Sequence, residues 1–427
     1  MSNYKHPSYQ ISDVLRLIYK SGLTTTSGGN ISMRGDNGNI WITPGAVDKG
    51  KLTEKDIIKV KPDGSYEGLH KPSSELPFHL AIYRARPDIG SIIHAHPPAL
   101  VSFSIVRQLP DTAVIPQAKY LCGKVGYAPY EMPGSEELGQ SIAKEFEGGC
   151  NSVIMENHGT VVGGKDLSDA FMRFETLEFC ARSIIRAGMI GGAKSLTEDD
   201  IYKFENRENL YPEFEHLEPS SEEKLIRHKL CEYIARACRQ GLMISSYGTI
   251  SARLDGDSFL INPTNINRRH VDLQDLVLIK DRLREQGKVP SRAVTLHAEI
   301  YKNHPDVDCI ISTQSPNATA FCVAREQMDT RTIPESYIML EDIPMMPYGC
   351  QYGGGSDLVA RIGKHVPILL IENDSVLVTG KSILETFDRL EVAEFSANSL
   401  IDSHAIGELQ PIKEHEIQEL KEKFLVN

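Results

Sequence analysis

The chain has 427 residues and a formal net charge of -12 at neutral pH. Hydrophobic residues make up 41% and charged residues 24%, a balance typical of globular domains with sizeable cores rather than of extended disorder. This length suggests two domains. The negative charge disfavours non-specific binding to nucleic acid or to an anionic membrane surface, and we expect neither partner.

The cysteines and the N-terminus indicate a cellular compartment. The eight cysteines are scattered and form no Cys-x-x-Cys pair, which is typical of proteins in a reducing environment. Residues 1–7 lack an apolar signal core, and no later stretch supplies the roughly 20 apolar residues that a membrane-spanning helix needs. We therefore expect a soluble, cytoplasmic protein.

The first elements are a helix and a group of strands. Ile11, Val14, Leu15 and Ile18 recur at helical spacing, and Gly22 is a plausible C-terminal cap. Between residues 28 and 45 the apolar residues alternate and are separated by glycines and prolines, which predicts short strands joined by tight loops.

The next segments predict a helix between Pro72 and Pro87, followed by a strand that carries His94 and His96. Farther on, residues 152–155 predict a buried strand and residues 156–159 the turn beyond it. A long helix is expected from about Asp166.

An internal repeat runs through the chain. Residues 28–32 match residues 247–251, a shift of 219 positions, and residues 42–45 match 261–264 at the same shift. Residues 173–175 match 389–391, a shift of 216. Several collinear matches with little drift in spacing indicate a duplicated domain.

The ends of the two copies predict the domain boundaries. Residues 196–198 resemble residues 412–414, and a stretch rich in proline and charge follows the first of them. We expect a first domain at residues 1–210, an exposed linker at 211–219 and a second domain at 220–427. Ser220 and the residues after it look like the N-cap of the second copy's first helix.

Three histidines of the first copy form a candidate metal site. On a strand, His94 and His96 point to the same face, although such a pair taken alone fits an incidental role equally well. His158 lies in a turn after a buried strand, where a ligand projecting from the sheet end is expected. Three neutral imidazoles leave one coordination position of Zn²⁺ open, which is the catalytic arrangement.

Glu75 is a candidate general base near these histidines. Because Ser73 and Ser74 precede it at a probable helix start, a capping role explains it when it is considered alone. Its closeness to His94 and His96 favours proton transfer instead. Residues that can hold a phosphate through hydrogen bonds occur in nearby loops, although ordinary turn chemistry explains each singly: Gly29, Asn30, Thr43, Gly45, Ser73 and Ser74.

The ordered motifs resemble those of the class II aldolase and adducin family. They are residues 29–32 (Gly-Asn-Ile-Ser), 43–45 (Thr-Pro-Gly), 72–75 (Pro-Ser-Ser-Glu), 94–96 (His-Ala-His) and 157–159 (Asn-His-Gly). The resemblance covers nearly all of the first copy and, more weakly, the second. It implies an α/β fold of two tandem α/β/α domains, each with a mainly antiparallel central sheet flanked by helices.

The resemblance also assigns roles to residues of the first copy. His94, His96 and His158 match zinc ligands, Glu75 matches the catalytic base, and the six loop residues listed above match the phosphate-binding loops. Tyr120 matches a tyrosine that reaches a neighbouring subunit's site and protonates an aldehyde oxygen. Because the metal serves as the electron sink, no Schiff-base lysine is required.

The second copy lacks these groups. Residues 290–293 replace 72–75 and end in alanine, residues 373–375 replace 157–159, and we align Thr313-Gln314-Ser315 with His94-Ala95-His96. No imidazole and no base remain. We expect one zinc ion per chain, bound by the first copy, and a second copy that is degenerate and non-catalytic.

The second copy suggests a role in assembly. The family resemblance implies a fourfold ring with active sites between neighbours, and two tandem chains would supply four domains. In such a pseudo-fourfold homo-oligomer each active copy borders a silent one, where Ile338 occupies the position of Tyr120. Tyr337, one residue earlier, is then the candidate proton donor.

The motifs and the family resemblance suggest three functions. The first is a zinc-dependent lyase that cleaves a ketose 1-phosphate to dihydroxyacetone phosphate and an aldehyde. The second is epimerisation, dehydration or decarboxylation of a sugar phosphate on the same scaffold. Glu75 counts against the epimerases, which resemble this pattern but have Asp at that position. The third, a non-catalytic adducin-like assembly protein, is disfavoured by the intact ligand set.

Overall fold

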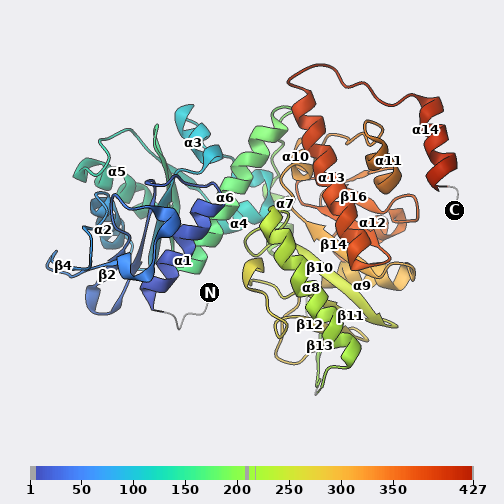
Figure 1. Cartoon of the computed structure of the whole chain (residues 1–427), viewed down its shortest axis with the longest axis horizontal. Helices are drawn as coiled ribbons and strands as arrows, with labels where there is room; N and C mark the ends of the chain where they lie inside the picture. The colour runs from blue at the N-terminus through green and yellow to red at the C-terminus, as the bar shows by residue number, and fades with distance from the viewer. Residues whose placement is uncertain (1–5, 207–210, 217, 426–427) are drawn as a thin grey trace. The chain divides into compact units, whose positions relative to one another are not determined.

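The structure, a computed structural model, describes residues 6–206, 211–216 and 218–425 (Figure 1). The chain divides into two compact units. The first comprises Met1–Thr112 with Gln117–Arg182, and the second comprises Ala113–Pro116 with Ser183–Asn427. The expected end of the first domain at residue 210 and residue 217 of the expected linker lie outside the described residues.

The first unit is built on an eight-stranded sheet in the order β4-β3-β2-β1-β5-β8-β7-β6. All neighbouring strands are antiparallel except β6 and β7. This confirms the expected mainly antiparallel sheet. The strands are β1 (Asn30–Arg34), β2 (Ile40–Ile42), β3 (Ile58–Val60), β4 (Tyr66–Glu67), β5 (Ser91–Ala95), β6 (Val125–Ala128), β7 (Ser152–Met155) and β8 (Gly159–Gly164).

Helices cover both faces of this sheet (Figure 1). Strand residues alternate between the faces: Ile93 packs in the cluster with α1 and α6, whereas its neighbour Ile92 packs in the cluster with α2 and α5. The expected α/β/α layering is therefore confirmed. The helices are α1 (Pro7–Lys20), α2 (Leu76–Ala85), α3 (Pro98–Ile105), α4 (Pro116–Cys122), α5 (Glu136–Glu147) and α6 (Leu167–Ala187).

The second unit repeats the plan. Its nine-stranded sheet has the order β15-β16-β17-β14-β10-β11-β12-β13-β9, which is the first sheet's order with one strand added at the edge. The strands are β9 (Glu213–Phe214), β10 (Thr249–Asp255), β11 (Ser258–Ile261), β12 (Val277–Lys280), β13 (Leu283–Glu285), β14 (Cys309–Thr313), β15 (Met345–Met346), β16 (Ile368–Ile371) and β17 (Val376–Gly380).

The helices α8 to α13 of the second unit follow the order of α1 to α6 in the first, and α7 and α14 are additional. α6 and α13 are both 21 residues long and follow the last strand of their sheets. The matched topology confirms the duplication that the sequence repeat indicated. The helices are α7 (Glu198–Glu205), α8 (Ser221–Gln240), α9 (Val294–Asn303), α10 (Ala318–Ala324), α11 (Pro334–Leu340), α12 (Ser356–Arg361), α13 (Ile383–Ser403) and α14 (Glu414–Leu420).

The segment expected to be a linker contains a strand. β9 pairs in parallel with β13, and Arg284 donates a backbone hydrogen bond to the Pro212 carbonyl. Ser220 then caps α8 by accepting a hydrogen bond from the Glu223 amide, as expected. In the described part of the chain, no helix is both long and apolar enough to cross a membrane.

One alignment between the copies was wrong by one residue. In the first sheet Asn30 pairs with His94, and in the second Thr249 pairs with Ser312. Since Thr249 occupies the place of Asn30, Ser312-Thr313-Gln314, rather than Thr313-Gln314-Ser315, corresponds to His94-Ala95-His96. A slip of one residue moves a side chain to the opposite sheet face, so strand register decides the matter.

Candidate metal centre and general base

The three histidines come from two adjoining places in the first sheet. His94 lies on β5, and His96 lies just beyond the end of β5 rather than on the strand as expected. His158 lies in the turn between β7 and β8, next to Asn157, whose φ of 52° gives the chain its tight reversal. β5 and β8 are paired, which brings the turn beside the end of β5.

The three imidazoles converge. One nitrogen of each lies within 4.8 Å of the others, and the ring centroids are 4.8, 5.0 and 5.2 Å apart. An ion at about 2.0–2.1 Å from each nitrogen requires inward ring movements of no more than about 1 Å. The spatial cluster that the sequence predicted is therefore present.

The donor atoms fit a cation. The Nε2 atoms of His94 and His96 are buried and have no hydrogen-bond partner among the described residues. Such orphaned acceptors are costly unless something else satisfies them. The Nδ1 atom of His94 lies 2.9 Å from the Thr160 carbonyl oxygen, so it donates there and presents its Nε2 lone pair to the site.

The ligand rings need two glycines beside them. A Cβ atom on Gly159 would lie 2.7 Å from His96 Cδ2, and one on Gly28 would lie 2.7 Å from His96 Nδ1. The corresponding residues of the second copy are Ser375 and Tyr247. The sequence analysis missed this role, although the loss of both glycines from the copy without histidines was a usable signal.

The charge state of the imidazoles suits metal binding. Burial, reinforced by His94 and then His158, lowers the pKa of His96 to about 4. Burial and His94 also lower the pKa of His158. Both rings are therefore neutral near pH 7, as metal ligands must be.

Glu75 lies against this cluster. Its Oε2 atom is 3.3 Å from His94 Nε2, and its Oε1 atom is 3.5 Å from His158 Nε2. Burial raises the pKa of Glu75, but His94, His158 and the hydrogen bond from Asn30 together outweigh burial, so the pKa is lower than usual. Although Glu75 precedes α2, its carboxylate makes no capping hydrogen bond. The carboxylate faces the metal site instead.

The expected phosphate-binding residues lie in three adjoining loops, except Asn30, which is the first residue of β1 rather than a loop residue as expected. Thr43 and Pro72 lie where the loop after β2 meets the loop before α2, because Ser73 donates a backbone hydrogen bond to the Thr43 carbonyl. The Thr43 hydroxyl accepts from the Ile31 amide, and the Ser73 hydroxyl accepts from the Glu75 amide. Ser74 is exposed and Gly45 half-buried, whereas the Asn30 side chain is buried and bonded to Glu75.

A buried lysine lies under these loops and was missed by the sequence analysis. Lys49 is 1% exposed, and its Nζ atom donates a 2.7 Å hydrogen bond to the Pro44 carbonyl. Burial, opposed by attraction to Glu75, lowers the pKa of Lys49 to about 8. The second copy has a buried Arg268 at this position, which also donates to backbone carbonyls. One lysine among many gave no sequence signal.

The two tyrosines considered as proton donors differ in exposure. Tyr120, on α4, is 52% exposed, whereas Tyr337, on α11, is 8% exposed. The ammonium of Lys421 lies 6.0 Å from the centroid of the Tyr337 ring. Only Tyr120 therefore presents its side chain at the surface of its own unit.

The second copy has no comparable cluster at the corresponding place. Ser312, Gln314 and Asp374 stand where the three histidines stand, and Ala293 stands in place of Glu75. Thr249 and Ser291 bond to each other there, with their hydroxyl oxygens 2.6 Å apart. These groups offer no set of imidazoles for a cation.

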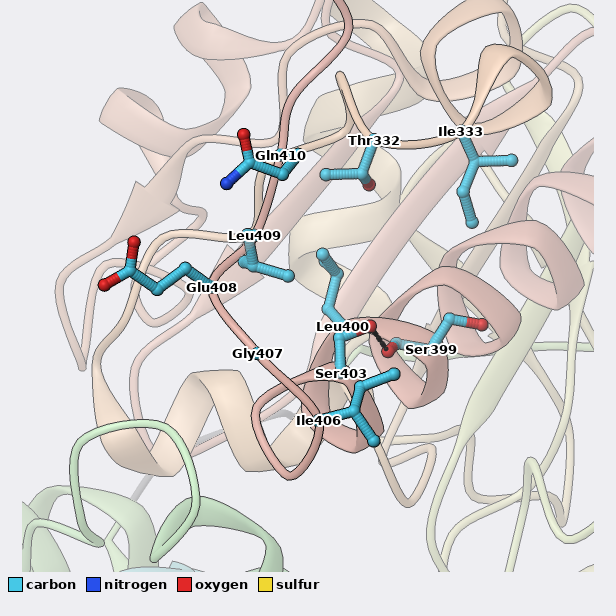
Figure 2. Close-up of a pocket in the computed structure, with 10 residues that line it drawn as sticks. All are labelled: Thr332, Ile333, Ser399, Leu400, Ser403, Ile406, Gly407, Glu408, Leu409 and Gln410. Carbon is cyan, nitrogen blue, oxygen red and sulfur yellow. Dashed lines mark hydrogen bonds between the residues drawn. The ribbon is translucent and has the colours of Figure 1, made fainter.

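A different pocket of about 360 Å³ lies in the second unit (Figure 2). Ile333, Leu400 and Leu409 give it an apolar lining, and Glu408 is the one charged residue among those drawn. Ser403 donates its hydroxyl hydrogen to the Ser399 carbonyl within α13. The pocket lacks the clustered acids, bases or ligands that chemistry needs.

The first unit is a layered α/β/α domain in which three imidazoles converge beside a carboxylate. The model of the class II aldolase and adducin N-terminal domain matches residues 9–185 and 228–401. These two regions comprise most of the chain, so the chain belongs to this family and contains its domain twice.

Three curated relatives show the range of the family. A 5-deoxy-D-ribulose 1-phosphate aldolase of Bacillus thuringiensis is 36% identical over 200 residues, which are 46% of this chain and 89% of the relative. A 3-oxo-tetronate 4-phosphate decarboxylase of Haemophilus influenzae is 32% identical over 45% of this chain and 92% of its own. An L-fuculose phosphate aldolase of Methanococcus maripaludis is 35% identical over 40% and 91%. Each relative therefore matches less than half of this chain.

Proposed function

We propose that the protein is a zinc-dependent lyase that reversibly cleaves a ketose 1-phosphate, such as L-fuculose 1-phosphate, to dihydroxyacetone phosphate and an aldehyde. The observation that carries the proposal is the convergence of three imidazoles with Glu75 in the first unit. Two of the three relatives described above are named as aldolases of sugar phosphates.

His94, His96 and His158 would hold the zinc ion. A divalent cation at this position supplies Lewis-acid stabilisation of the negative charge that develops on substrate oxygen when the carbon-carbon bond breaks or forms. Asn30 holds one oxygen of Glu75 through a 2.6 Å hydrogen bond, which fixes the carboxylate beside the ligands. The predicted site is one zinc per chain.

Glu75 and Tyr120 would exchange the protons. In the condensation direction, Glu75 takes the carbon-bound proton of dihydroxyacetone phosphate and Tyr120, from a neighbouring copy, donates a proton to the aldehyde oxygen. In the cleavage direction the tyrosine takes the hydroxyl proton, the carbon-carbon bond breaks, and Glu75 returns a proton to carbon.

The substrate phosphate would bind to the three adjoining loops. The polar groups proposed for it are those of Gly29, Asn30, Thr43, Gly45, Ser73 and Ser74. The side chains of Asn30 and Thr43 already have protein partners, and the Thr43 amide donates to the Ile31 carbonyl, so we assign these two residues to shaping the loops around the phosphate. The hydroxyl of Ser74, which is exposed, is available to an anion.

The proposed function includes a domain organisation and an oligomeric state. We propose domains at residues 1–210 and 220–427 joined by residues 211–219, a second domain without catalysis, and a homo-oligomer. If two chains form a pseudo-fourfold ring in which each first copy borders a second copy, Tyr337 takes the place of Tyr120 as the proton donor. We also propose a cytoplasmic location, which is consistent with the absence of disulfide bonds among the eight cysteines.

The test is a panel of ketose 1-phosphates incubated with the purified zinc-loaded protein, with dihydroxyacetone phosphate as the readout. Glu75→Gln should lower the rate by about 10²–10⁴-fold, because it removes the base and keeps the shape. A panel that releases no dihydroxyacetone phosphate from any member contradicts the lyase assignment.

A decarboxylase is the second candidate, because one relative is named as a 3-oxo-tetronate 4-phosphate decarboxylase. Both reactions leave negative charge next to a carbonyl group and need the same stabilisation. Release of CO₂ from a 3-oxo acid phosphate by the same preparation, without dihydroxyacetone phosphate from the ketose panel, favours this candidate.

A further inference from the structure

A chain of buried hydrogen bonds lies behind Glu75. Asn30 Nδ2 donates to Glu75 Oε2 at 2.6 Å, and His79 Nε2 lies 2.5 Å from Asn30 Oδ1. On the other side of the ring, His79 Nδ1 lies 2.7 Å from the Ser32 hydroxyl, which lies 2.8 Å from the Tyr83 hydroxyl. His79 is fully buried. The hydrogen bonds connect α2 to β1 and end at Glu75, the proposed base.

The ionised carboxylate fixes the direction of every bond in this chain. Glu75 can only accept, so the Asn30 amide nitrogen faces it and the Asn30 oxygen faces His79. That oxygen can only accept, so His79 carries its hydrogen on Nε2. Burial lowers the pKa of His79 far below its usual value, and the ring is neutral. Its Nδ1 therefore accepts from Ser32.

The second copy shows which of these hydrogen bonds belong to the shared scaffold and which accompany Glu75. His297 Nδ1 lies 2.7 Å from the Ser251 hydroxyl, which lies 2.7 Å from the Tyr301 hydroxyl, as in the first copy. On the opposite side, His297 Nε2 meets the Ser312 hydroxyl at 3.2 Å. The histidine, serine and tyrosine are thus part of the shared scaffold, whereas the link through Asn30 exists only in the copy that has Glu75.

We propose that His79 is a positioning residue for the reaction proposed above: its Nε2–H holds the Asn30 side-chain amide in the one orientation that presents its nitrogen to Glu75. The carboxylate then has one oxygen fixed and the other free to exchange a proton with substrate. Without this donor the Asn30 oxygen loses its partner and the amide is held by its bond to Glu75 alone, so the carboxylate is fixed less firmly. The effect on kcat rests on the proposed function, whereas the orientation of Asn30 does not.

Two matched substitutions test this role. In His79→Gln the amide nitrogen reaches about as far as Nε2 and can donate to Asn30. In His79→Asn the shorter side chain reaches Ser32 but not Asn30. We expect His79→Asn to lower kcat about 10- to 100-fold while KM changes less than about 3-fold, and His79→Gln to restore kcat to within about 5-fold of wild type.

A measurement without substrate tests the geometry directly. The side-chain NH₂ resonances of Asn30, assigned by their absence from Asn30→Asp, should shift in His79→Asn and return toward wild type in His79→Gln. This readout uses the full chain and needs no activity. If the wild-type protein cleaves no ketose phosphate, the lyase proposal fails, but the Asn30 resonances still test the orientation of its side chain.

His297→Asn is the control for lost stability, because it removes the equivalent imidazole from the other copy. It should lower the melting temperature about as much as His79→Asn and leave kcat within about 2-fold of wild type. The proposal is overturned if the Gln and Asn variants at position 79 lose kcat equally, if His297→Asn loses kcat as much, or if the Asn30 resonances do not move.

Discussion

Gly159 lies so close to His96 that a Cβ atom on it would be 2.7 Å from the Cδ2 atom of the imidazole and 2.6 Å from the Ala95 carbonyl oxygen. A contact that short forces the ring or the backbone to move. We predict that Gly159→Ser, which introduces the residue found in the second copy, weakens zinc binding by at least about 10-fold without changing a ligand. Zinc affinity measured by competition with a chelator checks this.

Gly407→Ser is the control for that substitution, because a Cβ atom at Gly407 meets nothing within 4 Å. It should bind zinc as tightly as wild type. Equal zinc affinity in Gly159→Ser and Gly407→Ser would show that the glycine does not make room for the ligand ring.

Zinc content should follow the first copy alone. We predict about one zinc per chain in the wild-type protein, and loss of that zinc in His94→Ala, because two imidazoles hold the ion far less tightly than three. Ser312→Ala, the matching substitution in the second copy, should keep full occupancy. Elemental analysis after dialysis gives the ratio, and a wild-type chain that never retains metal contradicts the site.

Tyr120 and Tyr337 should differ in their effects on catalysis. We expect Tyr120→Phe to lower kcat about 10²- to 10³-fold, since the exposed phenol is the group proposed to move a proton. Tyr337 is buried in its own unit, so Tyr337→Phe should alter the melting temperature more than kcat. A large loss of kcat in Tyr337→Phe alone would assign the donor to the second copy instead.

Lys49 should impose a pH-dependent cost on folding. Burial places its pKa near 8 in the folded chain, below the usual value of 10.5, so protonation favours the unfolded chain. This cost is present below about pH 8 and disappears as the pH rises toward 10.5. We predict that Lys49→Met raises the free energy of unfolding at pH 7 by on the order of 1–3 kcal/mol.

The increase in the free energy of unfolding caused by Lys49→Met should shrink as the pH rises from 7 to 10. Denaturant unfolding at several pH values measures this. Lys51→Met is the control, since Lys51 is exposed and its ion pair with Asp48 is loose. A gain that does not vary with pH would mean that Lys49 is charged in the folded protein throughout this range.

The sequence predicted the parts of the fold that depend on local pattern. The helix at residues 7–20 follows the spacing of Ile11, Val14 and Ile18, and the strand at residues 152–155 was expected at those bounds. The repeat predicted two sheets of one design. The alignment of Thr313 with His94 was wrong because it kept the shift of 219, although residues 290–293, which replace 72–75, already show a shift of 218 before β14.

The candidate metal ligands and the candidate base were predicted from the sequence, but the residues that hold them in place were not. Three histidines and Glu75 were identified from motif and turn position, and the structure brings them together. His79 was missed because its partners Asn30 and Ser32 lie 49 and 47 positions away, and Lys49 was missed because no local pattern shows that its side chain is buried. Asn30 was assigned to phosphate as a loop amide, and its bond to Glu75 depends on pairs of residues 45 positions apart.

The second unit retains the backbone frame that holds the candidate metal ligands in the first. Its turn before β17 keeps an asparagine at positive φ, Asn373 at 54°, and its strand ends occupy matching register. We therefore expect that a second set of metal ligands can be built in this unit by substituting side chains, without changing the backbone. The graft consists of Ser312→His, Gln314→His, Asp374→His, Ala293→Glu, Tyr247→Gly and Ser375→Gly.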